Sequence, residues 1–94
     1  MKEGSFSMEE DDFSVYPTLV QKEFHAKYFA EDAGHVQMLL LNMNGEIQEV
    51  LADEQVEAGA YEPSFNLTKN YAPGIYLVAF KMNDEMEMQK IVIQ

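Results

Sequence analysis

Hydrophobic and polar residues alternate along most of the chain between Phe13 and its end. A period of two residues is typical of β-strands, because successive side chains of a strand point to opposite faces. No stretch between turns shows a sustained helical period. The apolar residues that share a face within each predicted strand are Phe13 and Val15; Phe24, Ala26 and Tyr28; Val36, Met38 and Leu40; Tyr76, Val78 and Phe80; and Ile91 and Ile93.

Turn-forming residues separate these strands. Asn44-Gly45 predicts a two-residue type I′ hairpin, since that turn needs positive φ at both positions, and Asn83-Asp84 predicts a second tight hairpin. Pro73-Gly74 predicts a further turn. Pro63 is expected to interrupt a strand that runs from 56 to 68, because proline cannot donate a hydrogen bond to the ladder.

The number and spacing of the strands predict the fold class. Residues 47–53 alternate poorly, which predicts a bulge or a sheet edge. About seven short strands, with turns roughly every ten residues, predict an all-β fold, an immunoglobulin-like antiparallel β-sandwich. Tyr76 follows a turn near the start of the sixth strand. In such sandwiches a tyrosine at this place bonds back to the preceding connection, so we expect a structural role for Tyr76.

The length of 94 residues fits a single domain with one core. Residues 1–12 are polar and end in the acidic run Glu9–Asp12, which predicts a flexible acidic linker or an artificial leader. The folded domain is expected to span residues 13–94.

The net charge of −11, with no arginine, argues against binding to nucleic acid or to anionic membranes, which depends on clustered basic residues. No apolar run approaches the ~20 residues of a membrane span, and the first residues lack the apolar region of a signal peptide. Either the protein is not exported by its own N-terminus, or the chain is the C-terminal piece of a longer one. We favour the second interpretation.

Candidate chemistry is sparse. The chain has no cysteine, no G-x-S-x-G nucleophile motif, and only two histidines, His25 and His35, which are expected to face solvent. Carboxylates cluster at 53–57 and at 84–87, in predicted loops, but neither cluster matches a calcium-loop motif, so solvated charges are the better interpretation. We therefore expect no catalytic site, no metal site and no cofactor.

Short motifs carry a resemblance to a known family. In chain order they are Val15-Tyr16-Pro17, then Leu41 to Glu46 with Gly45, then Phe65 to Thr68, then Pro73-Gly74-Ile75-Tyr76-Leu77-Val78, and finally Lys90 to Gln94. This series resembles the C-terminal sorting domains of proteins exported by the type IX secretion system of Bacteroidetes. The similarity covers about Phe13 to Gln94. One departure is Thr18-Leu19, which stands where the family has Asn-Pro.

The resemblance implies a non-catalytic sorting signal that is carried at the C-terminus of a cargo protein. The cargo would cross the periplasm and pass the outer membrane to the cell surface or the medium, and a surface sortase-like protease would remove the domain. The implied partners are the type IX machinery, that protease and the attached N-terminal cargo. No nucleic acid and no membrane insertion are expected.

The residues expected to carry the signal are Lys90, Ile91, Val92, Ile93 and Gln94, and those expected to carry the family's structural motif are Tyr16, Pro17, Gly45, Gly74, Ile75 and Tyr76. A last strand that ends at the chain terminus would present an unpaired edge, which a receptor reads by strand addition and which would also allow an edge-strand dimer. Ile91 and Ile93 are also expected to fill the core.

An alternative function is an immunoglobulin-like accessory module, for binding or as a spacer, in a secreted bacterial enzyme. It predicts a row of exposed aromatic side chains, with Tyr16, Phe29, Tyr61 and Tyr71 as the candidates.

Overall fold

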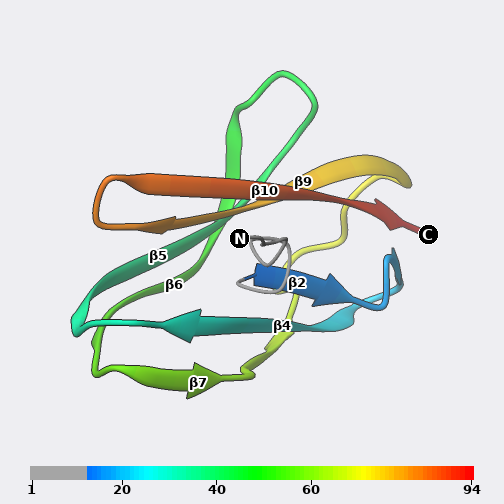
Figure 1. Ribbon diagram of the computed structural model, residues 1–94. Helices are drawn as coiled ribbons and strands as arrows, with labels where there is room; N and C mark the ends of the chain where they lie inside the picture. Colours follow the sequence, from blue (N-terminus) through cyan, green and yellow to red (C-terminus); the bar gives the residue numbers. More distant parts are fainter. Residues whose placement is uncertain (1–12) are drawn as a thin grey trace, which may run out of the picture.

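Two β-sheets pack face to face in the computed structural model, which describes residues 13–94 (Figure 1). The predicted leader, residues 1–12, lies outside the described residues. The strands are β2 (Phe13–Tyr16), β3 (Leu19–Val20), β4 (Glu23–Ala30), β5 (Gly34–Leu41), β6 (Ile47–Val56), β7 (Gly59–Tyr61), β8 (Ser64–Asn66), β9 (Gly74–Met82) and β10 (Glu85–Ile93). The all-β sandwich is confirmed, and an immunoglobulin-like arrangement is consistent with it.

The described residues form nine strands rather than about seven. Pro63 separates β7 from β8, and both pair with β4, as the interrupted strand predicted. The predicted start at 56 is wrong, because Val56 ends β6 and β7 begins at Gly59. The additional strand is β3, a two-residue strand that follows the cis peptide bond between Tyr16 and Pro17. Two residues are too few to show a period, so the alternation pattern did not reveal this strand.

The five-stranded sheet has the order β3-β10-β9-β5-β6, and the other sheet has the order β2-β4-β7 with β8 also paired to β4. β10 pairs antiparallel with β9 and parallel with β3. The prediction of a bulge or a sheet edge at 47–53 is confirmed: β6 is an outer strand, and its pairing with β5 shifts register twice. The chain therefore crosses from one sheet to the other between β2 and β3.

The core lies between the sheets and consists of the residues that alternation placed on the inner faces. Phe24, Val36, Met38, Val78 and Ile91 are among the fully buried side chains. At one end of the sandwich, aromatic rings from both sheets meet: Phe13 stacks on Phe80 and Tyr28 contacts Phe80, with ring centroids 5.0 and 4.8 Å apart. Packing of rings at these distances adds to the stabilisation from burial alone.

The turn at Asn44-Gly45 differs from the predicted type I′ hairpin. Only Gly45 has positive φ, at 85°, and the loop spans three residues. The Gly45 N–H donates to the Asn42 carbonyl and the Asn42 N–H donates to the Glu46 carbonyl, both at 3.0 Å. The side chain of Asn42 explains the difference, because its oxygen accepts from the N–H groups of Asn44 and Glu46 and holds residue 44 at negative φ.

Two other local predictions are confirmed. The Tyr76 hydroxyl donates to the Ala72 carbonyl at 2.8 Å, the bond to the preceding connection expected of a tyrosine corner. Asn83 and Asp84 form a two-residue turn between β9 and β10, with Asn83 at a φ of 56°. Residues 13–94 contain no helix long and apolar enough to cross a membrane.

Candidate functional site

The terminal strand β10 lies between β9 and β3, so its last residues are paired on both sides. Val92 is paired with Ile75 of β9 and with Leu19 of β3. The Val92 N–H donates to Thr18 and the Gln94 N–H donates to Val20, both at 2.8 Å. The expectation of an unpaired edge at the chain end is therefore wrong for these residues, because β3 occupies that edge. Because β3 is already paired there, this end of β10 cannot pair with a second copy of the chain in an edge-strand dimer.

Alternation along β10 divides the five predicted signal residues into two groups. Ile91 and Ile93 point into the core and are buried, as expected. Lys90 and Val92 lie on the opposite, outer face of the sheet, where Lys90 is exposed and Val92 is half-buried. Gln94 is exposed beyond the end of the strand. A binding partner can therefore contact the side chains of Lys90, Val92 and Gln94 from outside the sandwich.

Three of the six predicted motif residues lie beside this end of the strand: Pro17, Gly74 and Ile75. Pro17 leads into β3, and Gly74 and Ile75 begin β9 opposite Ile93 and Val92. Leu19, Val92 and Ile75 therefore form one cross-strand row that joins three segments distant in sequence. Tyr16 is exposed and stacks on His25. Gly45 lies beyond β5, at the turn into β6.

Ahead of Val92, no described strand pairs with the outer edge of β10, and a side chain closes the gap to the other sheet. The Gln89 amide donates to the Val15 carbonyl at 2.8 Å and accepts from the Val15 N–H at 3.0 Å. These two bonds imitate a strand partner for β2 and connect segments 74 positions apart. We call this pair of bonds the Gln89 clasp.

A tyrosine and a carboxylate fasten the loop before β9. The Tyr71 hydroxyl donates to Glu49 at 2.6 Å, and the Tyr71 ring meets the Tyr76 ring edge-on at 5.8 Å. Burial, and then the bond and charge of Glu49, raise the pKa of Tyr71 to about 12. Burial, together with the charge of Glu54, also raises the pKa of Tyr28.

The remaining polar candidates do not assemble into a chemical site. His25 and His35 both lie on outer sheet faces, as expected. His25 is half-buried with Nδ1 2.7 Å from Ser64 Oγ, and the exposed His35 is paired with Asp53. Asp53 and Glu54 lie within β6 rather than in a loop. Within residues 13–94, no three histidine, aspartate or glutamate side chains are grouped to hold a metal ion.

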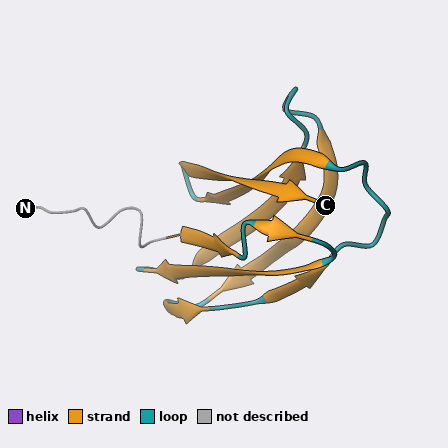
Figure 2. Ribbon diagram, turned by 90° about the vertical axis from the view of Figure 1, so that its right-hand side faces the viewer, coloured by secondary structure: helices purple, strands orange, loops and turns teal. Residues whose placement is uncertain are grey.

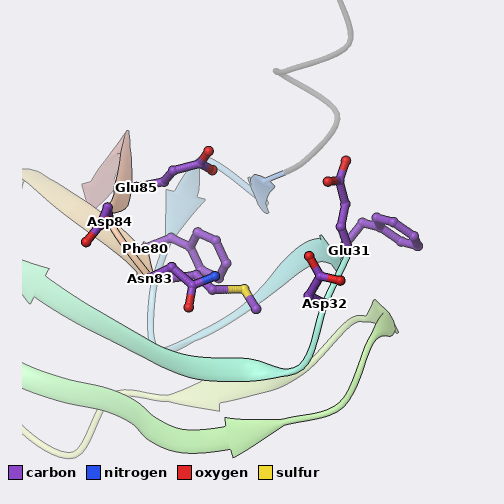
Figure 3. A pocket seen from close by; sticks show the side chains of 8 residues that line it. Glu31, Asp32, Phe80, Asn83, Asp84 and Glu85 are labelled. Carbon is purple, nitrogen blue, oxygen red and sulfur yellow. The ribbon is translucent and has the colours of Figure 1, made fainter.

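A hollow of about 350 Å³ lies at the end of the sandwich where β2 begins (Figure 3). Phe80 and Met82 contribute to its lining, and acidic side chains from two connections, Glu31 and Asp84 among them, stand around it. The hollow lies far from the chain end: Phe13 stacks on Phe80 near it, whereas Ile93 is paired with Gly74 at the other end (Figure 2). It is therefore separate from the predicted signal.

Reasoning from the sequence missed a second apolar cluster, on the outer face of the five-stranded sheet. It contains Leu39, Leu41 and Ala79, with Leu77 packed against them. The sequence does indicate this cluster through two uninterrupted apolar runs, 38–41 and 75–80. Strands that are apolar on both faces show continuous rather than alternating hydrophobicity.

Comparison with known proteins identifies the domain. The sequence model of a family described as the secretion system C-terminal sorting domain matches residues 14–94, which is nearly the whole described fold. A search of curated proteins found no match, and neither did a search of solved structures. The matched segment contains β10 and the motifs that surround its end. The chain thus belongs to the family of secretion system C-terminal sorting domains.

Proposed function

We propose that residues 13–94 are a non-catalytic signal that directs an attached cargo protein across the outer membrane through the type IX secretion system. The match of the family over residues 14–94 carries this proposal. After transport, a surface sortase-like protease would remove the domain and leave the cargo on the cell surface or outside the cell. The cargo would enter this route from the periplasm.

The position of the terminal segment supports its role in recognition. A cargo attached ahead of β2 would join the domain at the end opposite to Gln94 (Figure 2). The cargo would therefore leave Lys90, Val92 and Gln94 accessible to the transport machinery. We propose these three side chains as the part of the terminal signal that is read, and Ile91 and Ile93 as residues that hold the strand in place from the core.

The test uses a periplasmic reporter fused ahead of the full 94-residue chain in a bacterium with a type IX system. We expect the reporter at the cell surface with the chain attached and in the periplasm without it. Removal of residues 90–94 is a poor probe of the signal, because it deletes the core residues Ile91 and Ile93. Lys90→Ala combined with Val92→Thr keeps the core intact, and Lys27→Ala is a matched control on the other sheet.

The expected result is loss of surface reporter for the double variant and normal export for Lys27→Ala. Export that is unchanged by Lys90→Ala with Val92→Thr would contradict the assignment of the terminal signal. A reporter that remains in the periplasm with the unaltered chain would contradict the sorting function itself.

The accessory-module alternative is not favoured by the placement of the aromatic candidates. Tyr16 and Phe29 are exposed. Tyr61 donates to the Glu57 carbonyl and stacks on Tyr28, and Tyr71 is bonded to Glu49. The four rings therefore do not form the exposed row that binding to an extended glycan would use.

A further inference from the structure

The outer faces of the two sheets differ in chemistry. On the four-stranded sheet the outer positions are mostly polar, as in Ser14, His25, Lys27 and Ser64. On the five-stranded sheet they are mostly apolar. A sheet that packs on a core with one face is expected to be polar on the other, so the second case calls for an explanation.

Strand register arranges the apolar residues of that face in three adjacent rows. One row is Leu19, Val92 and Ile75; the next is Lys90, Leu77, Leu41 and Ile47; the third is Met88, Ala79, Leu39 and Val50. We call these rows the outer apolar face. Its centre is already buried by its own side chains, whereas Leu19, Ile47, Val50, Ile75 and Met88 around the centre are exposed. The face lies on the side of the sandwich away from β2 and β4 (Figure 1).

The size of the face fits a reversible contact. Five strands spaced about 4.8 Å apart, and three rows along them, make a surface of a few hundred Å². The largest apolar patch on a typical monomer is of this size and is often functional. A standard protein interface buries about 800 Å² on each partner, so the face would form the centre of such an interface rather than all of it.

Charge indicates what kind of partner fits. The chain carries a net charge of −11, yet the three rows contain no carboxylate, and their one charged side chain is Lys90. Lys90 is exposed, and no carboxylate within residues 13–94 pairs with it. A second copy of the chain is a poor occupant, since two copies at −11 repel each other and both bring a lysine to the contact.

We propose that the outer apolar face docks on a partner protein of the transport route whose own surface is apolar and carries an aspartate or glutamate opposite Lys90. This inference rests on the proposed sorting function and extends it from the last five residues to a surface that includes β5, β6 and β9. Met88 suits such a surface, because its flexible side chain adapts to the shape of a partner.

The test places a carboxylate on the face at positions outside the terminal segment. Met88→Asp and Val50→Asp change side chains that are 51% and 54% exposed, and Phe29→Asp, at 52%, is the matched control on the other sheet. Within the terminal segment, Lys90→Glu reverses the one charge of the face, and Lys27→Glu is the matched charge reversal on the other sheet. Each is measured as surface reporter in the fusion with the full chain, together with thermal unfolding of the purified chain to confirm folding.

We expect Met88→Asp, Val50→Asp and Lys90→Glu to lower surface reporter about tenfold, because an unpaired or repelled charge at an apolar contact opposes binding. Phe29→Asp and Lys27→Glu should export normally. Normal export of Met88→Asp and Val50→Asp, with the unaltered chain exported, would overturn the docking surface and leave the sorting function intact. Sedimentation should show a monomer; a dimer that Met88→Asp dissociates would assign the face to a second copy and overturn the proposal.

Discussion

The Gln89 clasp is expected to hold the two sheets together where no strand does. Its two bonds satisfy both backbone groups of Val15, a residue that is 2% exposed. A typical hydrogen bond contributes about 0.5–1.5 kcal/mol net, and a buried group left without a partner costs about 1–3 kcal/mol. Gln89 itself is half-buried, so water can reach part of the vacated site in Gln89→Ala. We therefore expect Gln89→Ala to lower the free energy of unfolding by about 2 kcal/mol.

Urea denaturation followed by circular dichroism measures this loss. With a denaturant slope of about 1 kcal/mol/M for a domain of this size, the midpoint should fall by about 2 M. Gln89→Glu should also destabilise, since a carboxylate accepts from the Val15 N–H but has no donor for the Val15 carbonyl. Gln55→Ala is the control, because Gln55 is exposed on the outer strand β6. If Gln89→Ala shifts the midpoint no more than Gln55→Ala does, the clasp does not stabilise the fold.

Three further predictions concern stability. Tyr76→Phe removes the bond to Ala72 and should cost about 1 kcal/mol of unfolding free energy in urea, whereas an unchanged midpoint would show that the tyrosine corner contributes nothing. Gly45→Ala places a side chain at a φ of 85° and should lower the free energy of unfolding by about 1 kcal/mol. Gly45→Asn should lower it less, because asparagine tolerates this conformation. Equal losses of stability would refute the backbone explanation. The folded state raises the pKa of Tyr71 from 10 to about 12, so the contribution of the protonated Tyr71 hydroxyl to the free energy of unfolding is complete below pH 10 and is lost as the pH rises toward 12. Tyr71→Phe should therefore flatten the decline in stability between pH 10 and 12. An identical decline in both proteins would contradict this.

Much of the core could be predicted from the sequence, because a period of two residues is enough to decide which side chains share a face. Phe24, Val36, Val78 and Ile91 were all assigned to the core in this way and are buried. The tyrosine corner was also predictable, since its geometry is local: the bond spans four residues.

Features that depend on how the sheets close could not be predicted. β3 is set beside the chain terminus by the crossover after Pro17, and this pairing decides that the terminal edge is not free. The Gln89 clasp joins residues 74 positions apart through one side chain, which no local pattern reports. The turn at Gly45 was predicted in place but not in type, because the side chain of Asn42 selects its hydrogen bonds.

The sorting function is tested most directly by the location of a periplasmic reporter fused ahead of the full chain, compared in a type IX-competent bacterium and in the same strain with that system disabled. We expect surface reporter in the first strain and periplasmic reporter in the second. A reporter that stays in the periplasm of competent cells that export their own cargo, or that reaches the surface equally without the system, would contradict it.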